Sequence, residues 1–207
     1  MGLASLGCMD VQTNRWPLLL AAIPAGMALN LAPGLTAMAW HAPIFLDAIG
    51  TIAFTLLFGW REGAVIGALS VLAGGLFNAH MPYFIFTQAV IAMVTGMSAR
   101  RGGFRKVSGI LITGIGMGVI AALVSAPAAA LAFDYTIFVG GSPPEILFGQ
   151  QTGENLRLAF ATIKFWVEPV DKILQCAAAV AIIKLLPKDL LRRMDSPASF
   201  LQANGFI

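Results

Sequence analysis

One stretch of 27 consecutive residues without a charged side chain decides the fold of this chain, VSGILITGIGMGVIAALVSAPAAALAF at positions 107–133. A transmembrane helix needs about 20 mainly apolar residues to cross the hydrocarbon core of a bilayer. The stretch is longer than that, so it predicts one helix that spans a membrane with some tilt.

The rest of the chain has the same apolar character. Of its 207 residues, 58% are hydrophobic and 11% are charged, whereas soluble domains contain about 25% charged residues. This composition excludes an ordinary soluble protein and a disordered chain. The predicted spans are Trp16–Ala32, Ile44–Trp60, Gly63–Phe77, Tyr83–Ala99, Val107–Phe133 and Pro169–Leu186. We therefore expect an all-α integral membrane protein, with a single six-helix membrane domain at 16–187.

The positions of the basic residues predict how these spans are oriented. Cytoplasmic loops of membrane proteins are enriched in lysine and arginine. With the N-terminus inside, ten of the thirteen cations fall in inner segments, and the first two outer loops contain none. The ten are Arg15, Arg61, Arg100, Arg101, Arg105, Lys106, Lys184, Lys188, Arg192 and Arg193. Both ends are therefore expected in the cytoplasm, as tails at 1–15 and 188–207.

A group of ionisable residues precedes and enters the last span. It consists of Lys164, Glu168, Asp171, Lys172 and Gln175. On one continuous helix these side chains fall within about 100° of a single face. Such residues in an apolar run are costly and usually mark a functional site or an ion pair. Two interpretations stay open and are compatible: a ladder of i,i+4 ion pairs, or the polar wall of a ligand cavity.

Pro169 leaves two possibilities for the last span. A proline either kinks a long helix or lies in the first turn of a helix, where its missing N–H costs nothing. We expect the second arrangement, with the span at Pro169–Leu186 and an outer hairpin or short helix at Leu158–Val167. This arrangement would place the charged group near the outer membrane face, where a ligand can reach it.

Further polar and aromatic residues are expected at the same outer end. Asp47 is either an acid at a helix start or a ligand contact, and His80 is either a turn residue or a ligand contact. The aromatic residues fit either an interfacial belt or the walls of a site for a flat ring. The candidate ligand-binding residues are Trp40, Asp47, Asn78, His80, Tyr83, Gln88, Lys164, Trp166, Glu168, Asp171 and Lys172.

The sequence contains no motif of a known catalytic or metal centre. It has no phosphate-binding loop for ATP, no His-Glu-x-x-His and no Gly-x-Ser-x-Gly. The chain has only two histidines and two distant cysteines, which argues against a metal site. We therefore expect no enzyme activity, no metal and no cofactor in this chain. A membrane enzyme based on Glu168 and Asp171 is the weaker alternative, because nothing supplies its nucleophile or metal.

Small residues recur at helical spacing in three runs. They are Ala21, Ala25 and Ala28 in the first, Gly63, Gly67, Ser70 and Gly74 in the third, and Gly114 and Gly118 in the fifth. Small residues let helices approach closely in lipid. The stripes therefore indicate either internal helix packing or a docking face for a partner protein, and docking fits the first run best.

Two regions of the chain resemble the S components of energy-coupling factor (ECF) vitamin transporters, the membrane subunits that bind the substrate. FLDAIGT at 45–51, followed by FGWREGAVIGA at 58–68, resembles their second-to-third helix region. DKIL at 171–174, followed by LLPK at 185–188, resembles their final helix and its cytoplasmic exit. The resemblance covers most of residues 16–193, and the chain departs from the simplest family pattern at Glu168-Pro169 and at 134–157.

The resemblance implies a substrate-capture subunit in the inner (plasma) membrane that spans it several times. Such a subunit binds a small vitamin or vitamin precursor, here expected to contain a ring, from the outer face. It delivers the ligand through a transmembrane coupling subunit driven by two cytoplasmic ATPases, which use the ATP. The family pattern makes Pro33–Pro43 a lid and Ala21, Ala25 and Ala28 the contact with the coupling subunit.

A small membrane sensor or scaffold domain without transport is the alternative function. It would use the same helices to detect a ligand and pass on a signal. The short segment at 188–207 contains no output domain and so favours transport. No nucleic-acid partner is expected.

Overall fold

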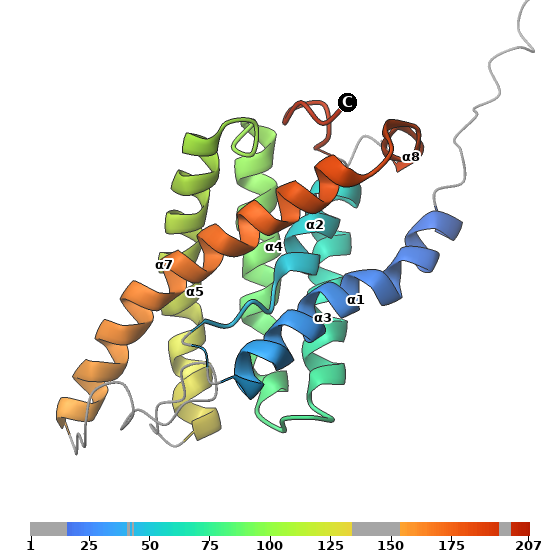
Figure 1. Cartoon of the computed structure of the whole chain (residues 1–207). Helices are drawn as coiled ribbons and strands as arrows, with labels where there is room; N and C mark the ends of the chain where they lie inside the picture. The colour runs from blue at the N-terminus through green and yellow to red at the C-terminus, as the bar shows by residue number, and fades with distance from the viewer. Residues whose placement is uncertain (1–15, 41, 43, 134–153, 195–199) are drawn as a thin grey trace, which may run out of the picture.

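The protein is described from a computed structural model that covers residues 16–40, 42, 44–133, 154–194 and 200–207, with side chains described except at 16, 129–133 and 154–165. This part of the chain contains helices and no strand, as predicted. The helices are α1 (Trp16–Ala39), α2 (Ile49–Phe58), α3 (Trp60–Gly74), the 3₁₀ turn η1 (Met81–Phe84), α4 (Ile85–Arg100), α5 (Val107–Phe133), α7 (Glu154–Leu185) and α8 (Lys188–Met194) (Figure 1).

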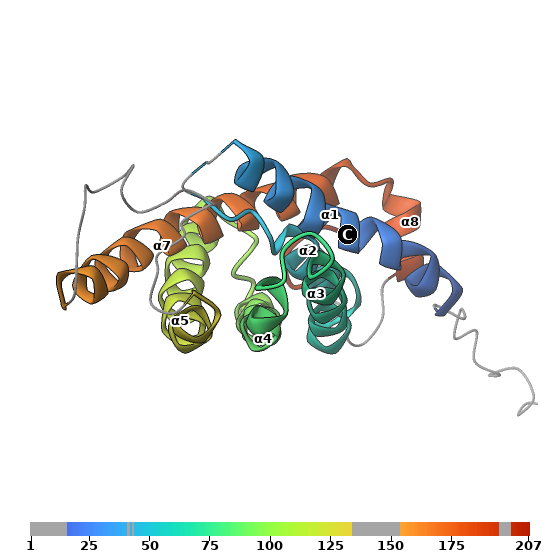
Figure 2. The same cartoon turned by 90° about the horizontal axis from the view of Figure 1, so that it is seen from below.

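The helices form two layers. α3, α4 and α5 lie side by side in a row, which Figure 2 shows end-on. α1 and α7 cross obliquely over one side of this row. α2 lies between the layers and contacts α1, α3, α4 and α7. The shortest of the apolar helices is therefore the central one.

Among the described residues, three helices are long and apolar enough to cross a membrane, at Pro17–Ala39, Met81–Arg100 and Val107–Ala128. They coincide with the first, fourth and fifth predicted spans, and they are typical of a membrane-embedded protein. α2 has 10 residues and is about 15 Å long, half the thickness of the hydrocarbon core. α3 has 15 residues, also fewer than one span needs. The structure thus leaves the count of six spans unconfirmed.

α2 is shorter than the predicted helix Ile44–Trp60 at both ends. Its first turn is capped from α1, because the Oδ1 atom of Asn30 accepts hydrogen bonds from Gly50 N (2.7 Å) and Thr51 N (3.1 Å). Residues 44–48 before it are not helical. The helix ends at Gly59, whose φ of 121° is accessible to glycine but rarely to other residues.

The predicted helix end near Pro33 is wrong, because α1 continues through Pro24 and Pro33 to Ala39. Membrane helices tolerate an internal proline where neighbouring groups compensate for the lost hydrogen bond. Directly after Pro33, Gly34 packs on the segment before α2, because a Cβ added to it would lie 3.4 Å from the carbonyl oxygen of Phe45. The predicted lid Pro33–Pro43 is therefore largely helical, and of its remainder His41 and Pro43 lie outside the described residues.

The predicted start of the last span is also wrong. α7 is a single helix of 32 residues that passes through Pro169, so there is no hairpin at Leu158–Val167. Pro169 lies against α5, where a Cβ added to Gly118 would overlap the Pro169 backbone, and Gly114 faces Ile173 in the same way. Gly114 and Gly118 of α5 thus serve internal packing. For α7, the observed arrangement is the other of the two possibilities, one long helix that contains Pro169.

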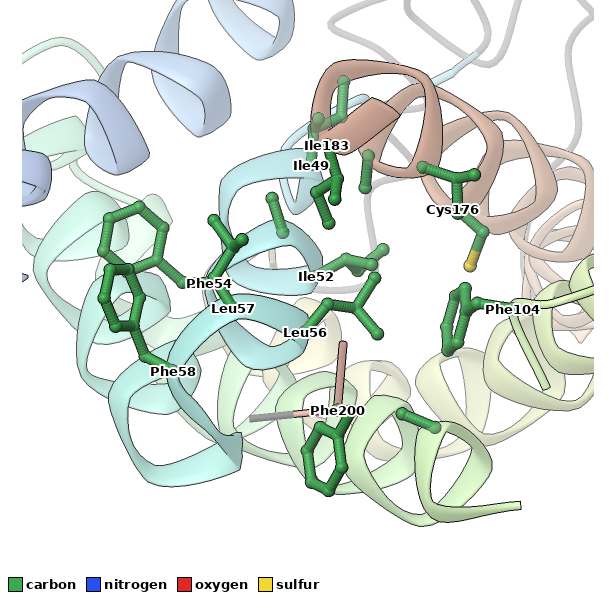
Figure 3. Packing of buried hydrophobic residues seen from close by; sticks show 14 of the residues in the cluster. Ile49, Ile52, Phe54, Leu56, Leu57, Phe58, Phe104, Cys176, Ile183 and Phe200 are labelled. Atoms are coloured by element: carbon green, nitrogen blue, oxygen red, sulfur yellow. The ribbon is translucent and has the colours of Figure 1, made fainter. Parts of the chain in front are cut away.

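The hydrophobic core is centred on α2, all of whose residues are buried. Figure 3 shows Ile52 and Leu56 directed toward Phe104 and Cys176, which come from the α4–α5 turn and from α7. On the other side of α2, the rings of Phe54 and Phe58 are in tilted contact, with centroids 5.2 Å apart. The helical part of the predicted span Ile44–Trp60 is thus enclosed by protein.

The exposed cations whose side chains the structure describes gather at one end of the molecule, the upper end in Figure 1. They are Arg61, Arg100, Arg101, Arg105, Lys106, Lys184, Lys188, Arg192 and Arg193. They come from the start of α3, the α4–α5 turn, the end of α7 and α8, as the orientation prediction requires. That this end faces the cytoplasm stays a prediction.

Residues 200–207 pack on this basic end as part of the domain. Phe200, Leu201 and Phe206 are buried in the core cluster, and Phe200 N donates to the carbonyl of Leu56 at the end of α2. Asn204 accepts a hydrogen bond from Phe104 N (2.9 Å) and donates to the carbonyls of Ala99 (3.0 Å) and Phe200 (2.8 Å). The segment therefore caps the ends of two helices.

Replacing Asn204 with alanine is expected to lower the free energy of unfolding by about 1–2 kcal/mol, because it leaves the buried N–H group of Phe104 without its acceptor. Thermal unfolding of the detergent-purified protein measures this. Gln202→Ala, at an exposed position of the same segment, is the control and should change stability little. Equal midpoints for the two variants would contradict the capping role.

Candidate functional site

The ionisable face of α7 lies in the interior. Glu168, Asp171, Lys172 and Gln175 are 4%, 0%, 2% and 0% exposed. Trp166, Val170 and Leu174, on the other side of the helix, are exposed. The prediction that one face of this helix carries the charges is confirmed for these residues. The side chain of Lys164, also predicted on this face, lies outside the described residues.

Lys172 is the centre of the charged group. Its Nζ atom lies 2.7 Å from Asp171 Oδ2, 3.5 Å from Asp47 Oδ1 and 3.6 Å from Glu168 Oε2. Glu168 is one helical turn before Lys172, as the i,i+4 ladder requires, whereas Asp47 comes from the segment before α2. We refer to Asp47, Glu168, Asp171, Lys172 and Gln175 as the charged cluster.

Asp171 fixes the segment before α2 to α7. Its Oδ1 atom accepts hydrogen bonds from Phe45 N (3.0 Å) and Leu46 N (2.9 Å), and its Oδ2 atom accepts one from Gln175 Nε2 (2.7 Å). Leu46 has a φ of 52°, the left-handed conformation that costs a non-glycine residue roughly 1–2 kcal/mol. The carboxylate therefore holds this segment in a conformation that its sequence alone does not favour.

A second set of polar side chains continues from the charged cluster across the bundle. Gln88 of α4 donates from Nε2 to the carbonyl oxygen of Asp47 (3.1 Å) and accepts at Oε1 from Thr51 Oγ1 (2.8 Å). Asn30 Nδ2 donates to Thr51 Oγ1 and Ser70 Oγ, both at 3.0 Å. One buried polar network thus links α1, α2, α3, α4 and α7.

The structure brings together five of the predicted site residues. Asp47, Gln88, Glu168, Asp171 and Lys172 belong to the network. The other described candidates lie apart from it.

The aromatic candidates face outward and do not line the network. Trp40 is 80% exposed, Trp166 76% and Tyr83 49%. Asn78 and His80 form the turn before η1, where Asn78 Oδ1 accepts a hydrogen bond from His80 N. Their geometry is that of turn residues, the simpler of the two interpretations.

Sequence reasoning missed Asn30, Thr51 and Ser70 as members of the network. Asn30 lies within the predicted span Trp16–Ala32, is 2% exposed and connects three helices. The available signal was the isolated polar residue within an apolar run, which has to find a partner when it is buried.

The described residues offer no metal centre at the cluster, and one of its buried acceptors has no partner among them. In the described part of the chain, no group of three or more His, Cys, Asp or Glu is placed to hold a metal ion. The buried atoms without a hydrogen-bond partner among the described residues include Gln175 Oε1 and Thr87 Oγ1. A buried acceptor such as Gln175 Oε1 costs free energy unless a donor reaches it.

Comparison with known proteins finds no matching family, no matching curated protein and no matching solved structure.

Proposed function

We propose that this chain is the substrate-capture subunit of an ECF-type ABC importer in the inner (plasma) membrane. It binds a small, ring-containing vitamin or vitamin precursor from the outer face. The observation that carries the proposal is the charged cluster, which is buried inside an apolar helical bundle. Ionisable groups in such a place are costly and mark binding or transport sites.

The partial exposure of Asp47 supports binding from solvent. The side chain of Asp47 is 34% exposed, while that of Lys172, which it contacts, is 3% exposed. A ligand that reaches Asp47 therefore stands next to the buried members of the cluster. The unpartnered Gln175 Oε1 offers it a further contact.

The exposed face of α1 supports docking to a coupling subunit. Ala21, Ala25 and Ala28 are all exposed, whereas Gly26 and Asn30 of the same helix are buried against α2. Gly67 of α3 and Gly118 of α5 behave differently, because Gly67 packs on Gln88 and Gly118 packs on Pro169. Small residues exposed on a helix face suit close helix–helix contact in lipid. The partners in this proposal are the coupling subunit and its two ATPases.

The test combines ligand identification with transport. Mass spectrometry of small molecules released from the detergent-purified protein names the captured compound. Uptake of that compound is then measured in cells that also produce the coupling subunit and the ATPases. Ala25→Trp is expected to reduce uptake to background and to leave binding unchanged, because it obstructs only the docking face.

Ala177→Trp is the matched control, at an exposed position of α7, and should keep both uptake and binding. Loss of binding in Ala25→Trp would assign the alanine stripe to internal packing. Binding without any uptake in the unchanged chain would favour the sensor or scaffold function.

A further inference from the structure

We propose that the ligand of the charged cluster carries a positive charge, as an ammonium, an amidinium or a protonated ring nitrogen. The inference rests on the proposed function and narrows its substrate class. It excludes ligands whose recognised group is a carboxylate or a phosphate.

The first argument is the balance of charges. Among the described side chains, the carboxylates of Asp47, Glu168 and Asp171 surround a single ammonium, that of Lys172. Counting Lys164, one helical turn before Glu168, still leaves three carboxylates and two ammonium groups. With Lys164 counted, the unbalanced negative charge lies at Asp47, whose side chain is 34% exposed, so a cation that comes from solvent can balance it.

The second argument is independent of charge and concerns Gln175. Its side chain is 0% exposed, and its Nε2 atom donates to Asp171 Oδ2, which directs the amide into the cluster. The Oε1 atom of the same amide has no hydrogen-bond partner among the described residues. An amide oxygen only accepts, so the group that satisfies it has to donate.

The third argument is which carboxylate a ligand can reach. Asp171 is already engaged by two backbone N–H groups, Lys172 and Gln175. Asp47 is the most exposed of the acids in the cluster, and Lys172 lies 3.5 Å from its Oδ1 atom. An incoming cation would share Asp47 with Lys172, whereas an incoming anion would meet a carboxylate first.

Three probes with the same ring separate these possibilities: benzamidine is cationic, benzamide is neutral and benzoate is anionic. Their binding to the full-length protein in detergent is measured by calorimetry and by thermal shift. Benzamidine is expected to bind about tenfold more tightly than benzoate, the effect of one charge-assisted contact. Asp47→Asn should remove this preference, while Asp189→Asn, an exposed acid in α8, should keep it.

The outcomes distinguish this inference from the proposed function. Tighter binding of benzoate or benzamide overturns the cationic class and leaves capture of a small molecule intact. If no probe binds, the compound that co-purifies decides, because a cationic one supports the inference and a neutral or anionic one overturns it. If no probe binds and no compound co-purifies, the proposed function fails together with the inference. Should Asp47→Asn not fold, the ranking of the three probes on the unchanged chain is decisive.

Discussion

Replacing Asp171 with alanine is expected to lower the free energy of unfolding by about 3–5 kcal/mol, the cost of removing one partner from a buried ion pair. The substitution removes the closest contact of Lys172. Among the described residues, its Nζ atom then has only the carboxylate oxygens of Asp47 and Glu168, at 3.5 and 3.6 Å. It also leaves Phe45 N and Leu46 N without the acceptor that holds their segment. The first loss acts on Lys172 in α7 and the second on the segment before α2.

Asp171→Asn separates these two contributions. The amide oxygen can still accept from the two backbone N–H groups, but the negative charge beside Lys172 is gone. We therefore expect Asp171→Asn to unfold at a midpoint between those of the unchanged protein and Asp171→Ala in thermal scans of detergent-purified protein.

A loss below about 1 kcal/mol in Asp171→Ala would be typical of an exposed pair and would contradict the buried network. Ligand binding gives a second readout. Unchanged affinity in a folded Asp171→Asn variant would identify the cluster as a structural ladder alone.

The second large effect is expected from Gly118→Ala in α5. An added Cβ would overlap the backbone of Pro169 and Glu168, which cannot move aside as a flexible side chain can. Overpacking of this kind costs about 1–3 kcal/mol and occasionally more, and we expect the upper part of that range because backbone is displaced. The thermal midpoint of Gly118→Ala in detergent should therefore fall clearly below that of the unchanged protein.

Gly116→Ala is a matched control on the same helix. An added Cβ at Gly116 has nothing within 4 Å, so only the helix propensity changes, by about 1 kcal/mol or less in favour of alanine. Comparable destabilisation of the two variants would show that α5 and α7 do not pack as closely as described. A stable Gly118→Ala variant would do the same.

The charged face of α7 could be predicted because helical periodicity depends on local geometry alone. In the structure, one face of α7 carries Glu168, Asp171, Lys172 and Gln175, as their spacing predicts, and this face is buried. The link to Asp47 could not be predicted, since it depends on how a segment 125 residues away along the chain folds back. The hydrogen bonds of Asn30 belong to the same class, because their partners are set by packing.

The environment of the second apolar run could not be predicted from composition. An apolar side chain leaves water equally well for lipid and for a protein core, so composition does not distinguish the two environments. The run at 44–60 was predicted as a membrane span, and every residue of its helical part, α2, is buried by protein. The helix ends predicted at Pro33 and Pro169 were wrong. A proline marks a helix end more reliably in water than in a packed apolar bundle.

The burial of α2 has a consequence for the order in which the chain assembles during synthesis. A helix of 10 residues is too short to enter a bilayer as an independent stable segment. Its start needs Asn30 from α1, and its core contacts include Ile183 near the end of α7. A nascent chain that stops before α7 therefore leaves the centre of the bundle open. The tertiary structure is therefore completed only after α7 has left the ribosome.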